Sequence, residues 1–162
     1  MIQLQEALVL LAQHEVEFVI VGGVAASLHG SSLTTFDLDL CYSRESGNLE
    51  RLSRALAGFR PRLRGAPEDV PFLWDARTLR NGFHFTLTTE LGDLDLLAEI
   101  SGVGGYPQVR AASVLVELFG HRFAVLSVDG LIHSKRAAGR PKDLLAIPEL
   151  EALREAGKEA EE

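Results

Sequence analysis

Hydrophobic and polar positions follow two different periods along the chain, and these periods predict both helices and strands. A period of about 3.6 residues predicts amphipathic helices over roughly residues 2–14, 46–59 and 128–139. Alternation with a period of two, or a short apolar run between turn residues, predicts strands at 17–22, 36–42, 83–89, 93–100, 113–119 and 122–127. This order combines hairpins with crossovers. It therefore predicts an α+β domain with a small mixed sheet flanked by helices, rather than a doubly wound sheet.

Turn and cap residues set the expected limits of these elements. A short helix is expected after Gly22, ending near Gly30, and Gly92 is expected to lie in the turn of a hairpin. Ser46 or Asn48 is expected to cap the helix over 46–59. The remaining segments are predicted as a basic extended piece near residues 60–64, loops over 65–75 and 101–108, and helical segments from about Pro141 and from Pro148.

The length and composition indicate one globular domain over residues 1–162, with an acidic helical tail over about 148–162. No apolar run is long enough to cross a bilayer, and the first residues lack the basic start and cleavage site of a signal peptide. The single cysteine, Cys41, cannot form an internal disulfide, which fits a reducing compartment. We therefore expect a cytoplasmic protein without membrane association.

The net charge of −7 argues against broad, nonspecific binding of nucleic acid. Two basic clusters stand out against this acidic background. In an extended chain the alternating Arg60, Arg62 and Arg64 would lie on one side, and the second cluster consists of Lys135, Arg136, Arg140 and Lys142. Each cluster is either a local groove for RNA or a solvated surface, and charge alone does not separate these alternatives.

Two aspartates in the segment 36–42 carry the first indication of chemistry. Asp37 and Asp39 are two residues apart, so a strand projects both carboxylates from one face and places Leu38 and Leu40 on the other. Neighbouring carboxylates repel one another unless a cation or a proton intervenes, and Mg²⁺ prefers such oxygen ligands. A solvated pair of edge-strand aspartates is the alternative explanation.

Two further features favour a phosphate and metal site. The Gly22–Gly23 pair ends a strand and opens a helix, where the backbone can approach a phosphate closely. The later segment "GDLDLLAEI" is a second acidic strand, which can supply a third carboxylate from a neighbouring position. Three such carboxylates are what a two-metal phosphoryl-transfer site requires.

The first of these motifs resembles the hallmark of the nucleotidyltransferase superfamily that includes DNA polymerase β. That hallmark is a hydrophobic residue, Gly, Gly or Ser, a spacer of about a dozen residues, and then Asp-h-Asp/Glu-h, where h is hydrophobic. Here Val21-Gly22-Gly23 is followed by thirteen residues and then by Asp37-Leu38-Asp39-Leu40. The third acid of the family lies on a later strand, where Asp95 matches best and Asp93 is the competitor.

Two other segments resemble the bacterial nucleotidyltransferase group that contains abortive-infection toxins. They are the small-residue segment "VAASLHG" and a late "K…R…KD" pattern formed by Lys135, Arg140, Lys142 and Asp143. Members of this group often have an arginine where this chain has Leu33. The resemblance implies a minimal nucleotidyltransferase fold.

The resemblance also implies roles for individual residues. Asp37, Asp39 and Asp95 would be catalytic and would hold Mg²⁺ or Mn²⁺, and Asp95 would also activate the acceptor hydroxyl. The nucleotide would be bound by Gly22, Gly23, Ser31, Lys135, Arg140 and Asp143.

The leading interpretation is a magnesium-dependent nucleotidyltransferase that moves a nucleoside monophosphate from an NTP to an acceptor hydroxyl. The resemblance implies a toxin-like component of a toxin–antitoxin or phage-defence system, with a tRNA 3′ end or another RNA as acceptor and a cognate antitoxin as partner. The alternatives are transfer to a small molecule of the aminoglycoside type, or a catalytically weak nucleotide-binding module that acts through a partner.

Overall fold

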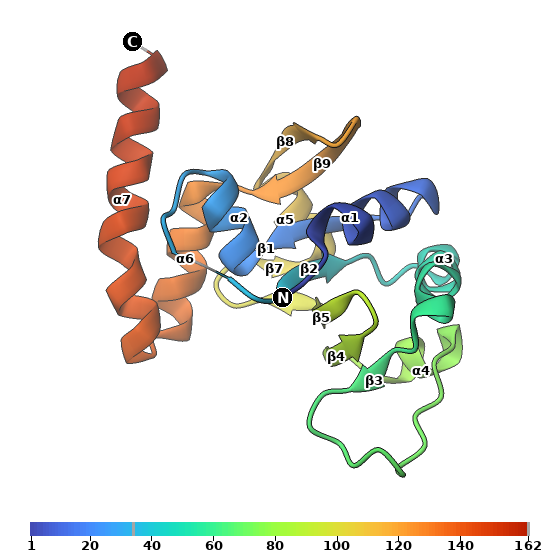
Figure 1. The fold of residues 1–162 in the computed structure, drawn as a ribbon. Coiled ribbons are helices and arrows are strands. Elements are labelled where there is room, and N and C mark those ends of the chain that lie inside the picture. Colours follow the sequence, from blue (N-terminus) through green and yellow to red (C-terminus); the bar gives the residue numbers. More distant parts are fainter. Residues whose placement is uncertain (34, 162) are drawn as a thin grey trace.

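A mixed seven-stranded sheet lies at the centre of the computed structural model, which describes residues 1–33 and 35–161 (Figure 1). Its strands lie in the order β3-β4-β5-β2-β1-β9-β8. The pairs β1–β9 and β2–β5 are parallel, and the other neighbours are antiparallel. The strands are β1 (Phe18–Val21), β2 (Leu38–Tyr42), β3 (Arg62–Leu63), β4 (Phe85–Thr89), β5 (Gly92–Leu97), β8 (Ser113–Leu118) and β9 (His121–Leu126). A separate ribbon is formed by β6 (Glu99–Ile100) and β7 (Gly104–Gly105).

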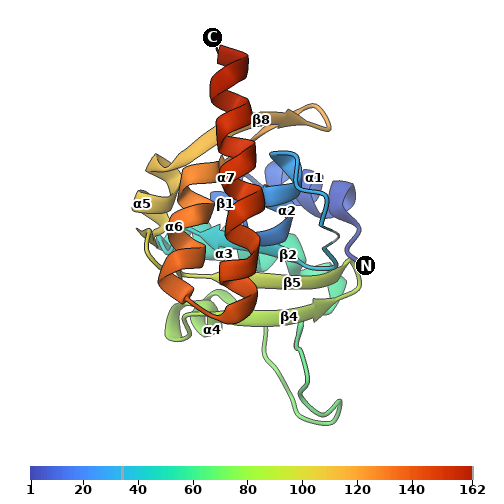
Figure 2. The same cartoon turned by 90° about the vertical axis from the view of Figure 1, so that its left-hand side faces the viewer.

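Helices surround this sheet, and the last two lie side by side along one flank (Figures 1 and 2). The helices are α1 (Leu4–Gln13), α2 (Gly22–Leu28), α3 (Ser46–Leu56) with the short 3₁₀ turn η1 (Ala57–Phe59), α4 (Ala76–Asn81), α5 (Tyr106–Ala111), α6 (Val128–Ala138) and α7 (Pro141–Glu161). Figure 2 shows the C-terminal end of α7 extending beyond the rest of the molecule. Within the described residues, none of the helices combines the length and the apolar character that a membrane crossing requires.

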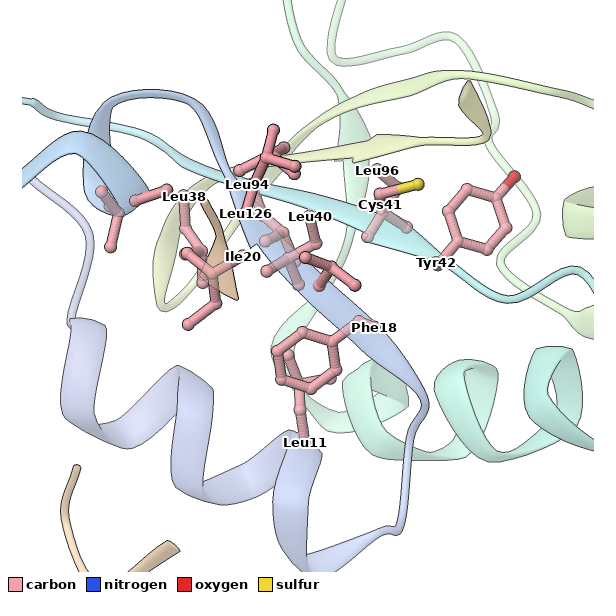
Figure 3. Close-up of a cluster of buried hydrophobic side chains, with 14 of the residues drawn as sticks. Leu11, Phe18, Ile20, Leu38, Leu40, Cys41, Tyr42, Leu94, Leu96 and Leu126 are labelled. Atoms are coloured by element: carbon pink, nitrogen blue, oxygen red, sulfur yellow. The ribbon is translucent and has the colours of Figure 1, made fainter. Parts of the chain in front are cut away.

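Leucines alternate with polar residues along β2 and β5, so these two strands each turn one apolar face into the core. Leu38 and Leu40 of β2 and Leu94 and Leu96 of β5 are at most 1% exposed. Figure 3 shows them among other buried side chains from β1, β2, β9 and α1. Each buried leucine stabilises the fold by about 1.5–3 kcal/mol. The same alternation turns the intervening aspartates to the opposite face.

Most expected elements are confirmed. The α+β class, the helices near residues 2–14 and 128–139, the hairpin around Gly92 and the hairpin from 113 to 127 all occur. Gly92 has a φ of +116°, and a Cβ there would approach the backbone of Ile2 to 2.7 Å, so the turn requires glycine.

The prediction that Ser46 or Asn48 caps α3 is wrong. The N-cap is Glu45, without a side-chain bond. Asn48 is instead fully buried and bonds to the chain before β1: its Oδ1 accepts from the backbone N–H of Glu17 at 2.7 Å, and its Nδ2 donates to the Glu17 carbonyl at 3.0 Å. The side chain therefore fastens α3 to the chain that leads into β1.

The helical segments expected from Pro141 and from Pro148 form one continuous helix, α7, and residue 162 lies outside the described residues. Pro148 cannot donate a backbone hydrogen bond, yet burial of Ile147 and Leu150 on either side holds the helix together. Two short helices, α4 and α5, were not expected. Asp75 caps α4 by accepting from the Thr78 N–H at 2.7 Å, and α5 begins within the expected loop over 101–108.

Candidate active site

The two acidic strands lie next to each other, and their carboxylates meet on the face opposite the buried leucines of β2 and β5. In the parallel pair β2–β5, Asp39 is in register with Asp95, just as Leu38 is with Leu94. Asp37 immediately precedes β2, and Asp93 lies two residues before Asp95 on the same face of β5. The structure thus brings together the acidic residues that come from two separate parts of the sequence.

Arg64 lies among these carboxylates. Its Nη2 is 2.7 Å from Oδ1 of Asp95, its Nε is 3.3 Å from Oδ2 of Asp93, and its Nη1 is 3.9 Å from Oδ2 of Asp37. The Nη2 group also donates to the carbonyl of Leu87 at 2.8 Å. The pKa of Arg64 is raised: partial burial acts to lower it, but the hydrogen bond and charge of Asp95 and the charges of Asp93 and Asp37 outweigh that effect.

The expectation that three arginines share one side of an extended strand does not hold. Arg60 has a left-handed φ of +49°, so the chain is not extended there, and its Nε lies 3.3 Å from Glu90. Arg62 lies 3.9 Å from Glu68. Of this cluster, Arg64 is the residue whose guanidinium contacts the aspartates.

Asp39 is the most strongly perturbed carboxylate of the group. Burial is the main cause that raises its pKa to about 7, followed by the charge of Asp95, a hydrogen bond with Asp95 and the charge of Asp37. Its Oδ1 is buried without a hydrogen-bond partner among the described residues. An unpartnered buried carboxylate oxygen is costly and is a feature that calls for a ligand or a proton.

The two glycines of the predicted phosphate turn leave room for the start of β2. Gly22 has a φ of +65°, and a Cβ at this position would collide with Oδ2 of Asp39. A Cβ on Gly23 would lie 2.8 Å from Oγ1 of Thr35, which in turn donates to the carbonyl of Asp37 at 3.1 Å. The absence of side chains therefore permits the close approach of α2 to the aspartate segment.

A cavity of about 290 Å³ connects Asp39 to the late basic segment. Gly22 and Asp39 line one side, and Lys135, Arg140 and Asp143 of α6, α7 and the intervening turn line the other. His84 lines the same cavity, and its Nδ1 accepts from the backbone N–H of Ala98 at 3.1 Å. Five predicted residues thus border one hollow.

Asp143 holds the basic side chains of this cavity in place. It is 1% exposed, its Oδ2 accepts from Arg140 Nε at 2.6 Å, and its Oδ1 lies 3.5 Å from Lys135 Nζ. The hydrogen bonds from Arg140 are the main cause that lowers the pKa of Asp143, and the charge of Lys135 acts in the same direction. The carboxylate is therefore ionised at neutral pH and fixes the Arg140 guanidinium at the cavity wall.

Ser31 does not line this cavity, although it was expected to contact the nucleotide. The hydroxyl of Ser31 donates to Oε1 of Glu149 on α7, and that of Ser32 donates to Oε2 at 3.0 Å. These bonds lower the pKa of Glu149. The two serines connect the loop after α2 to the C-terminal helix.

Two functional candidates, Arg64 and His84, were missed by sequence reasoning. The alternation in "FRPRLRG" is the one local signal for Arg64, but it does not show which strand will pair with this segment. A larger hollow of about 700 Å³ lies between α1, Phe59 and Leu91. It contains none of the aspartates, so the smaller cavity, which contains Asp39, is the better candidate for chemistry.

The carboxylates suit a divalent cation by their chemistry. Asp37, Asp39 and Asp95 offer the oxygen donors that Mg²⁺ prefers, and the buried Oδ1 of Asp39 has no hydrogen-bond partner among the described residues. Within the described part of the chain, no group of three or more Asp, Glu, His or Cys side chains is arranged around one metal position. The guanidinium of Arg64 lies between three of the acids instead.

The mixed sheet, the helix that begins at the glycine pair and the acidic residues on adjacent parallel strands define an α+β protein with a nucleotidyltransferase fold. The fold is similar to that in a crystal structure of a provisionally assigned nucleotidyltransferase from Thermotoga maritima. It is 17% identical in sequence, with a TM-score of 0.51, and the match covers 98% of this chain and 96% of that one. No protein-family model and no curated protein sequence matches the chain.

Proposed function

We propose that the protein is a metal-dependent nucleotidyltransferase, which transfers a nucleoside monophosphate from an NTP to an acceptor hydroxyl. The observation that carries this proposal is the register of Asp39 with Asp95 beside Gly22, at a cavity that also contains Lys135 and Arg140. The fold similarity is compatible with this chemistry.

In this proposal Asp37, Asp39 and Asp95 hold Mg²⁺ or Mn²⁺, which would neutralise the charge on the triphosphate. The acceptor oxygen forms a bond to the α-phosphorus while the bond to the β-phosphate bridging oxygen breaks, and pyrophosphate leaves. The proton of the acceptor hydroxyl passes to a carboxylate, for which Asp95 is the candidate and Asp93 the competitor.

The basic wall of the cavity would bind the phosphates. Lys135 and Arg140 supply positive charge, and Asp143 fixes their positions through the contacts described above. Gly22 borders the same cavity, where its backbone would approach a phosphate, while its missing Cβ leaves room for the Asp39 carboxylate. Ser31 and Gly23 remain proposed nucleotide contacts on the resemblance alone.

The central experiment measures pyrophosphate release and label transfer with NTPs, Mg²⁺ and total tRNA. Asp39→Asn should lower turnover by about 100-fold or more, because one carboxylate of the proposed metal site is lost. Asp95→Asn and Asp93→Asn identify the third acid, since one of them should abolish turnover and the other should not. Asp69→Asn, which changes an exposed loop carboxylate, is the matched control. Undiminished turnover by Asp39→Asn would overturn the metal assignment.

The acceptor is either an RNA end or a small molecule. A toxin-like enzyme acting on tRNA, with a cognate antitoxin, is what the resemblance implies. One observation favours a small, aminoglycoside-type acceptor: basic side chains of both clusters are paired with acids, as in Arg60–Glu90, Arg62–Glu68 and Arg136–Glu151. Label transfer to tRNA would exclude that preference. Binding of NTP without turnover on either class would favour the nucleotide-binding module.

A further inference from the structure

Arg64 lies between three of the four carboxylates of the acidic group. It lies within 4.0 Å of Asp37, Asp93 and Asp95, and its side chain is 28% exposed. Asp39 is not among its ion pairs, and the buried Oδ1 of Asp39 has no partner within the described residues. One guanidinium thus pairs with three of the four carboxylates, and the fourth, Asp39, has no direct contact with a positive charge in the described part of the chain.

A guanidinium and a divalent cation compete for the same oxygens. Asp95 Oδ1 is committed to Arg64 at 2.7 Å, and Asp37 Oδ2 faces the same side chain at 3.9 Å. Both residues belong to the metal site of the proposed function. An ion bound by Asp37, Asp39 and Asp95 would place two positive charges beside the guanidinium. Neighbouring like charges repel one another, so the ion and the guanidinium would disfavour each other at this site.

The attachment of Arg64 allows its side chain to move while its backbone stays in place. The backbone N–H of Arg64 donates to the Thr86 carbonyl at 2.9 Å, which holds the chain against β4. The strand β3 is an edge strand of two residues, and the chain continues into the exposed Gly65, around which nothing lies within 4 Å of a Cβ position. The Arg64 side chain is 28% exposed, so a rotation toward solvent is open to it once its hydrogen bond to the Leu87 carbonyl breaks.

We propose that Arg64 is an internal counter-ion of the carboxylate group, and that a divalent cation must displace its guanidinium in order to bind. This inference rests on the proposed function, because it concerns the same site. In the absence of the ion Arg64 holds the carboxylates together. In its presence the guanidinium leaves Asp37 and Asp95, so the arginine sets the concentration of metal at which the site fills.

The test is a titration of the protein with Mn²⁺ alone. Binding is monitored as the loss of the free-ion signal in electron paramagnetic resonance. Arg64→Met removes the charge and keeps the apolar stem, so the Kd for Mn²⁺ should fall by about tenfold or more. Arg62→Met is the matched control: it removes a guanidinium two residues earlier, one that pairs with the exposed Glu68, and should leave the Kd within about twofold. An unchanged or higher Kd in Arg64→Met would overturn the proposal.

Thermal unfolding supplies a second readout. In EDTA, Arg64→Met should unfold about 2–8 °C below the wild type, because the carboxylates then repel one another without a counter-ion. Saturating Mn²⁺ should remove this difference. If Arg64→Met does not fold, Arg64→Lys takes its place; its single ammonium group reaches fewer carboxylates, so its Kd should lie below that of the wild type. A Kd equal to or above the wild-type value would overturn the proposal here too.

The result also separates this inference from the function on which it rests. If the wild type binds Mn²⁺ and releases pyrophosphate while Arg64→Met gains no affinity, the counter-ion proposal fails and the proposed function stands. If neither protein binds Mn²⁺ and no pyrophosphate appears, both fail.

Discussion

At the scale of the residue, Asp39 is costly to bury, and the same position makes it a candidate for chemistry. The leucines on either side of it are buried, so its own side chain must point to the opposite face, where Asp95 lies in register. Burial and the neighbouring carboxylates raise its pKa to about 7. A metal ligand must be deprotonated, so binding of Mn²⁺ at this residue should strengthen as the pH rises through neutrality.

The same pKa predicts how stability depends on pH when no divalent ion is present. Because the pKa of Asp39 is about 7 when folded and 3.8 ordinarily, the folded chain binds the proton more tightly. The free energy of unfolding should therefore fall as the pH rises from about 4 to 7, by at most about 4 kcal/mol, and then level off. Denaturant unfolding in EDTA across this range measures the effect.

The variant Asp39→Asn cannot titrate at this position and should show a flatter profile over the same range. Glu149, whose pKa is lowered from 4.5, acts in the opposite sense and only at lower pH, so it does not mask the change. A wild-type profile that rises between pH 5 and 7, or an identical slope in Asp39→Asn, would contradict the assignment.

At the scale of the element, buried polar bonds fix how α3 joins the sheet. Helix α3 has no side-chain cap at its start. Its place is set instead by Asn48, which bonds to both backbone groups of Glu17 just before β1 and donates to the Ser43 carbonyl at 2.8 Å just after β2. One side chain thus fastens the helix to the two strands that lead to Gly22 and from Asp39.

Asn48→Ala should therefore destabilise the protein by about 2–4 kcal/mol, because it leaves buried backbone groups of Glu17 and Ser43 without partners. Asn81→Ala, at the exposed last residue of α4, is the control and should change the free energy of unfolding by less than about 0.5 kcal/mol. Denaturant titration of both variants gives the comparison. Equal stabilities would show that water replaces the asparagine.

At the scale of the whole molecule, the C-terminal helix completes the wall of the candidate site. Helix α7 carries Asp143, which orders Lys135 and Arg140, and its buried Ile147 and Leu150 belong to the core cluster. Farther along, residues 155–160 are exposed, and Figure 2 shows this end of the helix standing free of the sheet. The first half of α7 should therefore contribute to the stability of the fold and to the candidate site, and the last residues should contribute little to either.

A chain that ends after Arg154 should keep the free energy of unfolding within about 1 kcal/mol, because the surface ion pairs it loses contribute little. A chain that ends after Gly139 should lose several kcal/mol, since it removes Asp143 and the buried side chains of α7. Thermal unfolding compares the two truncations. A stable shorter chain would show that α7 is not part of the cooperative core.

The sequence indicates which face of each strand is apolar, because side-chain direction depends only on local backbone geometry. The alternation in "FDLDLCY" and "GDLDLLAEI" is enough to place the leucines Leu38, Leu40, Leu94 and Leu96 on one face and the aspartates on the opposite face. The short helices α4 and α5 escaped this reasoning because each has six residues, too few to show a helical period. The continuity of α7 escaped it because packing around Pro148 outweighs the lost hydrogen bond.

By itself, the sequence determined the α+β class, the acidic strands and the glycine pair, since these follow from short-range patterns. Only the tertiary structure decided that Asp39 faces Asp95, that Arg64 lies among the carboxylates and that Lys135, Arg140 and Asp143 share a cavity with Asp39. Strand order and register depend on packing between segments far apart in the chain, and no local period encodes that packing.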